Sequence, residues 1–258
     1  MKEIGKVKKI ILWGFIILIV AFIFTKYFFY EVPILTYHCI NGACPDGSRL
    51  CVNTQDFQKQ MDFISRYRYR VIPLKDLIEA LAKNKALSRN TVVITSDDGY
   101  EDNYQNAFPI LKKYGFSATL FVITDQVGKQ GFCSWEQLKE MQNNGIDIGS
   151  HTKTHPYLPQ VNEEKLRKEI FESKKEIENK LGKKISLFCY PNGGYSSKIQ
   201  DLVRQAGYSA AFTTNKGRYH LKPDLFALRR IKMTDDSGNP WVMWVKLSGI
   251  YNFLRTKN

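Results

Sequence analysis

The sequence predicts an α/β fold in which parallel strands alternate with helices, as a parallel sheet or a (β/α) barrel. Short β-branched and aromatic runs alternate about seven times with segments whose apolar residues recur at helical spacing, a pattern typical of parallel strands joined by helices. The chain has 258 residues, of which 43% are hydrophobic. This is enough for one sizeable core, so a single domain of this class is expected.

The expected elements follow one another along the chain. Strands are expected at residues 32–37, 70–73, 91–95, 117–123, 146–150, 185–190, 208–214 and 225–231. Helices are expected between them at residues 54–67, 74–83, 102–113, 134–145, 162–182 and 196–206. The strands are rich in Val, Ile, Leu, Phe and Thr, and the helices carry apolar residues three and four apart. The longest helix has Asn162 as its expected N-cap and Gly182 as its expected stop.

An uncharged apolar run near the N-terminus predicts a membrane anchor. Four lysines precede residues 10–24, and Lys26 and aromatic residues follow. The 21 residues from Ile10 to Tyr30 would form roughly 31 Å of helix, enough to cross a bilayer core. We expect residues 1–30 to be a cytoplasmic tail and an uncleaved transmembrane signal-anchor, with the rest extracytoplasmic at the cytoplasmic membrane. A cleaved signal peptide is the alternative.

The charge and the C-terminal segment also favour a membrane partner. The formal net charge is +13, and no recognised nucleic-acid motif accompanies it, so an anionic membrane surface is expected rather than nucleic acid. Residues 236–258 form an amphipathic segment with Trp241, Trp244 and Lys246. Such a segment either lies at the membrane interface or packs against the rest of the fold. The sequence carries no prediction of protein partners.

Three of the five cysteines, Cys39, Cys44 and Cys51, lie close together. Outside the cytoplasm a disulfide such as Cys44–Cys51 is expected, with free thiols as the alternative. Their spacing is not a zinc signature.

Ionisable side chains follow three of the expected strands. His38 comes after the first strand, Asp97 and Asp98 after the third, and His151 and His155 after the fifth. Because parallel α/β folds place their chemistry at the carboxyl ends of strands, these groups are expected to lie together. Two histidines and one carboxylate suit a divalent metal ion that activates water. The second aspartate can then accept a proton.

Three motifs, TSDDGY, SHTKTHP and YPNGGYS, resemble those of the NodB-like polysaccharide deacetylases, a carbohydrate esterase family. The resemblance covers residues 31–235 and implies a distorted (β/α)7 barrel that removes N-acetyl groups from amino sugars with a metal ion. It implies Asp98, His151 and His155 as metal ligands and Asp97 as the general base. Zinc is the expected ion, with cobalt or nickel as alternatives.

The chain departs from the usual family pattern at three places. Ser96 replaces a phenylalanine, and Cys189 and Tyr190 stand where the third motif normally has the arginine that orients the base. The late Leu-x-His motif, which normally supplies the general acid, is missing, and His220 is a poor match for it.

The segment PILTYHCI resembles the first strand of the subgroup that contains the poly-β-1,6-N-acetylglucosamine deacetylases. This resemblance implies His38 as the general acid. A late Leu-Arg-Arg-Ile strand is also similar to that subgroup and implies Arg230 as the partner of Asp97, with a surface arginine as the alternative. A histidine pKa near neutrality would suit proton donation.

The resemblance also implies a substrate loop and a class of substrate. The loop is expected to stabilise an oxyanion, through the backbone N–H of Asn192, and to contact the sugar through Tyr190, Pro191, Asn192 and Tyr195. The expected substrate is poly-N-acetylglucosamine or an undecaprenyl phosphate-linked N-acetylhexosamine, with peptidoglycan ranked third. A catalytically inactive carbohydrate-binding protein of the same fold is the alternative, which the joint presence of the two aspartates and two histidines disfavours.

Overall fold

The computed structural model describes residues 6, 11–17, 20, 30–41, 50–215 and 223–252. Its strands are β1 (Ile34–Tyr37), β2 (Arg70–Val71), β3 (Thr91–Ser96), β4 (Ala118–Val122), β5 (Ile146–Ser150), β6 (Leu187–Cys189), β7 (Ala210–Thr213), β8 (Leu228–Arg229) and β9 (Ile231–Lys232). Its α-helices are α2 (Thr54–Arg66), α3 (Leu74–Ala82), α4 (Phe108–Tyr114), α5 (Trp135–Asn143), α6 (Glu163–Arg167), α7 (Ser173–Leu181), α8 (Ser197–Gln205) and α9 (Pro240–Lys246).

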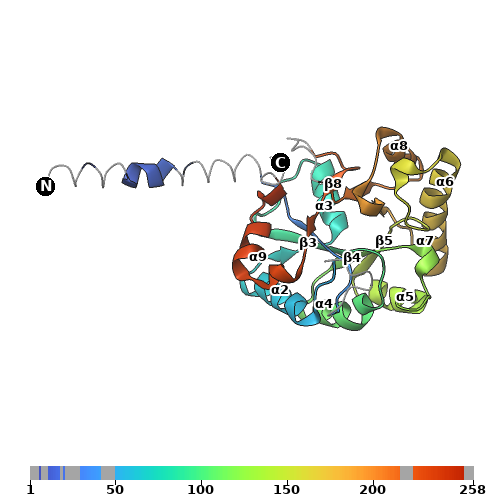
Figure 1. Cartoon of the computed structure of the whole chain (residues 1–258), viewed down its shortest axis with the longest axis horizontal. Helices are drawn as coiled ribbons and strands as arrows, with labels where there is room; N and C mark the ends of the chain where they lie inside the picture. Colours follow the sequence, from blue (N-terminus) through green and yellow to red (C-terminus); the bar gives the residue numbers. More distant parts are fainter. Residues whose placement is uncertain are drawn as a thin grey trace.

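The strands form a parallel sheet that closes into a barrel with helices around it (Figure 1). The order is β8-β7-β6-β5-β4-β3-β1-β9, and β2 pairs with the start of β3. Only Arg230 separates β8 from β9, yet β8 pairs with β7 and β9 pairs with β1. This one segment therefore joins the two edges, and the expected single strand at 225–231 is two short strands. The parallel α/β barrel is confirmed.

The apolar core has two parts because successive side chains of a strand point to opposite faces. Along β3, Val92 and Ile94 join the larger cluster, together with residues of the surrounding helices. Val93 between them joins a smaller cluster with Phe121 and Phe212 of other strands. The smaller cluster joins side chains of several strands to Leu74, Leu77 and Ile78 of α3.

Two of the expected helices contain a π-helical turn. The helix expected at 102–113 begins as η1 (Asn103–Ala107) and continues as α4. The helix expected at 162–182 runs as α6, η4 (Lys168–Glu172) and α7. Its expected cap and stop are confirmed, since the Asn162 side chain accepts a hydrogen bond from the Lys165 N–H and Gly182 is left-handed. Such π turns are uncommon and often occur at functional sites.

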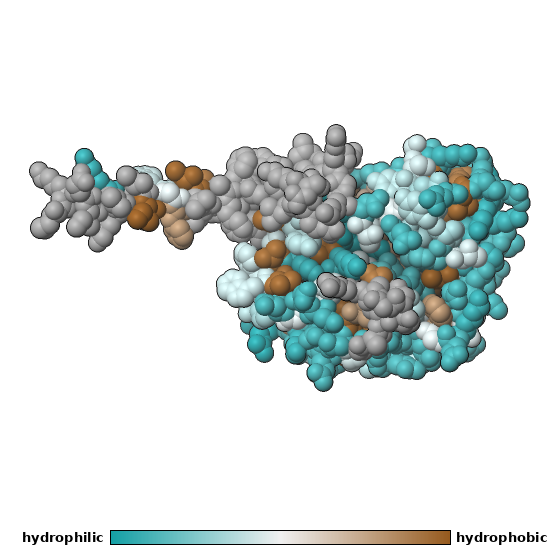
Figure 2. Space-filling view, in the orientation of Figure 1, coloured by the Kyte–Doolittle hydropathy of each residue, from teal (hydrophilic) through white to brown (hydrophobic). Residues whose placement is uncertain are grey.

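The N-terminal segment is described only in part. The predicted anchor at residues 10–30 falls largely outside the described residues. Residues 11–17 are helical with exposed, mostly apolar side chains, and brown hydrophobic residues appear in this segment in Figure 2. Within the part of the chain that the structure describes, no helix combines the length and the apolarity needed to cross a membrane.

One face of helix α9 packs against the barrel, and the other face is exposed. Met243 and Lys246 are buried, and the Lys246 ammonium donates to the Lys232 carbonyl. Trp241 and Trp244 are 78% and 46% exposed. The packing alternative for this segment therefore holds for one face, and Lys246 belongs to that buried face.

Candidate metal and catalytic site

The strand ends bring the predicted polar side chains to one mouth of the barrel. His38 follows β1, Asp97 and Asp98 follow β3, and His151 follows β5. Strands β1, β3, β4 and β5 are successive neighbours in the sheet, so these groups converge although they are far apart in sequence. Asp97 is 2% and His151 2% exposed.

Asp98, His151 and His155 form a group that can hold a metal ion. Oδ1 of Asp98 lies 3.6 Å from Nε2 of His151 and 3.7 Å from Nε2 of His155. Ligand atoms about 2.1 Å from a tetrahedral ion lie about 3.4 Å from one another. The residues therefore fit a divalent ion, and three protein ligands leave a coordination position for water or substrate.

The surroundings of His151 point its Nε2 into this group. Nδ1 of His151 lies 2.9 Å from the Cys189 carbonyl oxygen, which can only accept a hydrogen bond. Nδ1 therefore carries the proton, and Nε2 presents its lone pair toward Asp98. Burial lowers the pKa of His151 to about 3, so the imidazole is neutral, as a metal ligand must be.

Backbone strain is concentrated in the loops that carry the three candidate ligands. Asp98, Thr152 and His155 have positive φ angles of 71°, 69° and 62°. This left-handed conformation costs roughly 1–2 kcal/mol for a residue with a Cβ atom. Gly99 is also left-handed, and a Cβ atom there would lie 3.0 Å from the Val122 side chain. The surrounding structure must therefore stabilise these turns.

Asp97 lies beside this group and pairs with Arg230. Nη1 of Arg230 is 2.6 Å from Oδ1 of Asp97, and Nη2 is 2.6 Å from Oδ2. Arg230 is 1% exposed, so the alternative of a surface arginine is wrong. Nη2 also contacts Sγ of Cys189 at 2.9 Å. The guanidinium thus reaches the strand position at which the sequence lacks the family's arginine.

The ion pair controls the charge of Asp97. Burial alone would raise the pKa of Asp97, but the Arg230 guanidinium lowers it by more. The pKa therefore lies below its ordinary value, and the carboxylate is ionised at neutral pH. An ionised, oriented carboxylate is the state in which Asp97 can accept a proton.

His38 borders the same carboxylate from β1. Its Nε2 lies 3.9 Å from Oδ2 of Asp97, and its side chain is 13% exposed. Burial lowers the pKa of His38 to about 4, although Asp97 opposes this shift. The near-neutral pKa expected from the sequence is therefore wrong, because the barrel mouth desolvates the ring. His220 lies outside the described residues.

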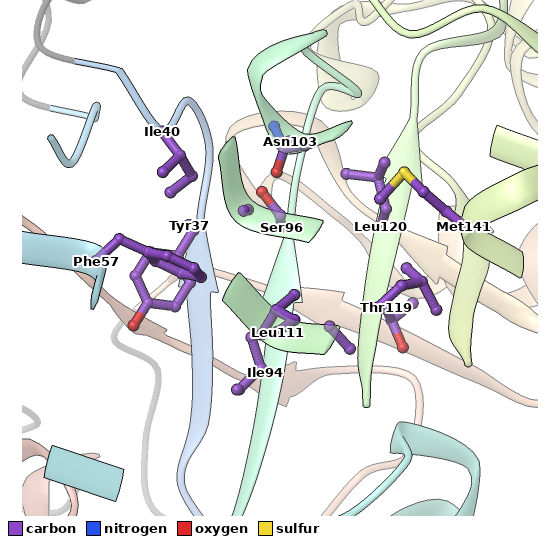
Figure 3. Close-up of a pocket in the computed structure, with 13 residues that line it drawn as sticks. Tyr37, Ile40, Phe57, Ile94, Ser96, Asn103, Leu111, Thr119, Leu120 and Met141 are labelled. Carbon is purple, nitrogen blue, oxygen red and sulfur yellow. The ribbon is translucent and has the colours of Figure 1, made fainter. Parts of the chain in front are cut away.

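Two polar side chains that sequence reasoning did not assign hold the backbone of His38. The Ser96 hydroxyl donates to the His38 carbonyl at 3.0 Å, and Nδ2 of Asn103 donates to the same oxygen at 2.8 Å. Both residues also line a cavity of about 20 Å³ among residues of β1, β3, β4 and the helices α2, α4 and α5, with room for about one water (Figure 3). In the sequence, Ser96 could have been singled out because it is a polar residue where the family has a phenylalanine.

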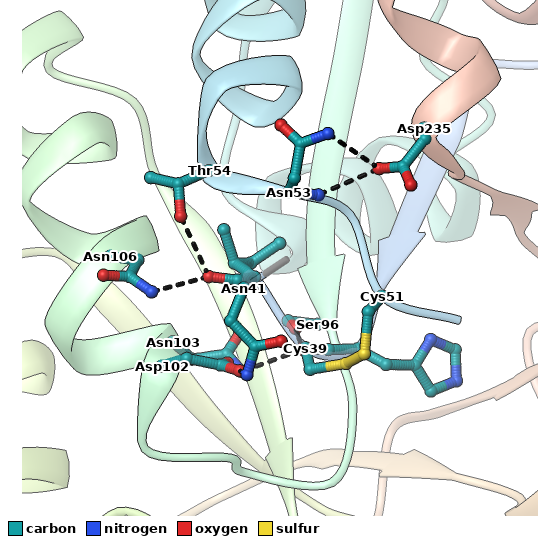
Figure 4. The surroundings of a disulfide bond; sticks show 12 residues. Cys39, Asn41, Cys51, Asn53, Thr54, Ser96, Asp102, Asn103, Asn106 and Asp235 are labelled. Carbon is teal, nitrogen blue, oxygen red and sulfur yellow. Dashed lines mark hydrogen bonds between the residues drawn. A yellow bond between two sulfur atoms is a disulfide. The ribbon is translucent and has the colours of Figure 1, made fainter. Parts of the chain in front are cut away.

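A disulfide joins Cys39, next to His38, to Cys51 (Figure 4). The Cα atoms of the two cysteines are 4.6 Å apart. The expected Cys44–Cys51 pair is wrong because Cys51 is already bonded, and Cys44 lies outside the described residues. The Asn106 side chain donates to the Ile40 carbonyl at 2.6 Å, so the loop after His38 is fixed from two directions.

The four residues predicted to bind substrate differ in how exposed they are. Tyr190 is 1% exposed, and its hydroxyl donates to the Phe226 carbonyl, so its side chain belongs to the core and the prediction is wrong for it. Pro191 is also buried, whereas Asn192 is exposed and left-handed, with a φ of 52°. Tyr195 is half-buried and stacks on Tyr190. Asn192 and Tyr195 remain available to a ligand.

The mouth of this parallel barrel carries a buried Asp–Arg pair, an Asp–His–His group and a neighbouring histidine. Together these features indicate a hydrolase built on an α/β barrel. The chain belongs to the polysaccharide deacetylase family, whose model, described as "Polysaccharide deacetylase", matches residues 84–211. YxkH of Bacillus subtilis (strain 168) is 34% identical over 204 residues, covering 79% of this chain and 72% of that protein. A poly-beta-1,6-N-acetyl-D-glucosamine N-deacetylase of Staphylococcus aureus is 28% identical over 200 residues, covering 72% and 69%.

Solved structures agree with this family. The deacetylase PplD of Streptococcus pyogenes, solved in complex with acetate, superposes with a TM-score of 0.78 at 29% identity, covering 84% of this chain and 97% of that one. IcaB from Ammonifex degensii superposes with a TM-score of 0.73 at 28% identity, with coverages of 84% and 97%. The NodB-like domain expected from the three motifs is confirmed.

Proposed function

We propose that this chain is a membrane-anchored, metal-dependent N-deacetylase that hydrolyses the acetamide of an N-acetylated amino sugar in a bacterial surface glycan or its lipid-linked precursor. Membership of the polysaccharide deacetylase family supports a hydrolase acting on N-acetyl groups. The metal-dependent mechanism is supported by one observation: Asp98, His151 and His155 lie beside the Asp97–Arg230 pair. It combines a candidate metal site with an oriented base.

In this proposal Asp98, His151 and His155 hold a divalent ion, zinc by preference over cobalt or nickel. The ion supplies Lewis acidity, which lowers the pKa of a water and polarises the acetamide carbonyl. Asp97, fixed by Arg230, takes the proton that the attacking water loses. An exposed loop residue, Asn192, offers its backbone N–H to the developing oxyanion.

His38 then delivers a proton to the leaving amine. Because its pKa is about 4, the free imidazole is neutral near pH 7 and must first receive that proton. Asp97, which takes the proton from water, lies 3.9 Å away, so the proton needs to move only a short distance between them. The water proton would thus reach the nitrogen of the sugar, and acetate leaves.

The membrane part of the proposal rests on the apolar N-terminal run and on two structural features. Residues 11–17 form a helical segment with exposed apolar side chains. At the start of the barrel, the Glu31 N–H donates to the carbonyl of Gly249, three residues after the end of α9, whose Trp241 and Trp244 are exposed. Tryptophan is favoured at membrane interfaces, so an extracytoplasmic barrel would hold α9 near the bilayer.

The substrate is proposed to be poly-N-acetylglucosamine or an undecaprenyl phosphate-linked N-acetylhexosamine. The first is supported by the relative whose name specifies poly-beta-1,6-N-acetyl-D-glucosamine. The second is supported by the +13 charge and by the proposed position at a bilayer, which would favour a phosphorylated lipid.

Acetate release from each substrate by the purified full chain tests the proposal. Chelation should abolish release and added zinc should restore it. Asp98→Ala, His151→Ala and His155→Ala should each lose metal and activity together. A chain that binds both glycans without releasing acetate at any metal loading would instead support the inactive carbohydrate-binding alternative.

A further inference from the structure

The loop between the two candidate histidine ligands depends on a buried carboxylate. Glu169, in the π turn η4, is 2% exposed. Its Oε2 accepts the N–H groups of Lys153 at 2.9 Å and Thr154 at 2.8 Å, and its Oε1 accepts the Thr154 hydroxyl at 2.5 Å. Among the described residues, all partners of this carboxylate lie in the loop from His151 to His155.

Because this loop is neither a helix nor a strand, regular backbone hydrogen bonds do not hold its shape. Thr152 and His155 are both left-handed, and the His155 N–H donates to the Thr152 hydroxyl at 3.0 Å. The N–H groups of Thr124 and Asp125 also donate to the carbonyls of Thr152 and Lys153. The loop is therefore held by two groups, the backbone amides of Thr124 and Asp125 and the Glu169 carboxylate.

Glu169 is itself fixed to the strand that carries His151. The Ser173 hydroxyl, at the first residue of α7, donates to the Glu169 carbonyl at 2.7 Å and hydrogen-bonds the Ser150 hydroxyl at 2.8 Å. Ser150 is the last residue of β5, immediately before His151. The π turn, the strand and the loop thus form one connected unit.

We propose that Glu169 is a positioning residue that sets the place of His155 in the metal site. His151 follows β5 directly and is oriented by Cys189, whereas His155 depends on the conformation of the loop. A carboxylate can accept both amides and the hydroxyl at once, and hydrogen bonds to a charged acceptor are roughly twice as strong as neutral ones. This inference rests on the proposed metal site.

The test compares Glu169→Gln with Glu172→Gln in the purified full chain. Glu172 lies in the same π turn, is half exposed, and meets the same loop only through the Lys153 ammonium at 3.7 Å. Glutamine keeps the size of Glu169 but replaces one acceptor with a donor that faces other donors. Zinc affinity is measured by competition with a chelator, and site geometry by the absorption spectrum of the cobalt form.

We expect Glu169→Gln to weaken zinc binding about 10–100-fold and to change the cobalt spectrum, and Glu172→Gln to match the wild type. Wild-type affinity and an unchanged cobalt spectrum in Glu169→Gln would overturn the proposal. If Glu169→Gln does not fold, Thr154→Val removes only the hydroxyl bond and should give a smaller loss in the same direction. Wild-type zinc affinity in a folded Thr154→Val protein would count against it.

Amide hydrogen exchange in the metal-free proteins separates this inference from the proposed function. Lys153 and Thr154 should exchange faster in Glu169→Gln than in the wild type and Glu172→Gln. Equal protection in all three would refute the role of Glu169. A wild-type chain that binds no zinc would reject the metal site, while the exchange rates still decide whether Glu169 holds the loop.

Discussion

Arg230 binds both carboxylate oxygens of Asp97, each at 2.6 Å, and both side chains are almost fully buried. The arginine comes from the junction of β8 and β9, where the barrel closes. Closure therefore supplies the cation that the third motif of this chain lacks. A bidentate pair fixes the plane of the carboxylate as well as its charge.

Arg230→Gln should destabilise the protein and reduce turnover. It leaves the buried Asp97 charge without its cation, and breaking a buried pair in this way costs about 3–5 kcal/mol. Urea unfolding measures the loss. Arg167→Gln, which removes an exposed pair with Glu163, is the control and should cost much less, because solvent screens exposed ion pairs. Equal losses in the two variants would show that the buried pair contributes little.

Asp97→Asn should retain zinc but lose most activity. The amide keeps the shape of the side chain but cannot act as the base, and a general base typically contributes about 10²–10⁴-fold. Acetate release and metal content of the same sample measure the two effects. Turnover close to that of the wild type would assign the base to another group.

His38→Gln should lower kcat strongly without loss of zinc, because the variant cannot deliver a proton to the leaving amine. His220→Ala is the matched control and should leave kcat unchanged. The measurement is the pH–rate profile of kcat for all three proteins. A strong loss in His220→Ala, with little effect of His38→Gln, would exchange the two roles.

The metal-free protein should lose stability as the pH falls from 6.5 to 4. Burial lowers the pKa of His38 from 6.5 to about 4 in the folded state, so in this range the unfolded chain binds a proton that the folded chain does not. The contribution of His38 to the free energy of unfolding therefore decreases as the pH falls and levels off below about 4. His151, with a folded pKa of about 3, contributes in the same direction. His38→Gln should therefore reduce this slope, as denaturant unfolding at several pH values would show. An identical slope in both proteins would contradict the assignment.

Reduction of the Cys39–Cys51 disulfide should lower the melting temperature. The bond closes a loop with a sequence separation of 12, and a loop of this size corresponds to about 3 kcal/mol in the chain-entropy model. Melting of the wild type with and without reductant measures the change. Cys133→Ser, which alters a buried free thiol, is the control and should remain sensitive to reductant. A wild-type melting temperature that does not respond to reductant would contradict the prediction.

The sequence by itself determined the class of fold and most of the site. Alternating strands and helices predict a parallel sheet, and polar residues just after β1, β3 and β5 mark the functional end, because those positions follow from local pattern and from the chemistry of parallel strands. Motif spacing singled out the aspartates and histidines. Asn162 and Gly182 were also predictable, since helix ends depend on local hydrogen bonds and φ angles.

Only the tertiary structure decided between the alternatives for groups that are distant in sequence. The resemblance implied Arg230 as the partner of Asp97 but left a surface arginine as the alternative; the two residues are 133 apart in sequence, and barrel closure decides that one is buried against the other. The choice of Cys39 as the partner of Cys51, the burial of Tyr190 and the low pKa of His38 likewise depend on packing. In the sequence, Glu169 is one of several acidic residues in a charged helix. Its three hydrogen bonds to the strained loop are apparent only in the structure, where it lies in the π turn beside that loop. Desolvation and long-range hydrogen bonding are properties of the assembled barrel, so they are set by contacts between elements that local sequence does not encode.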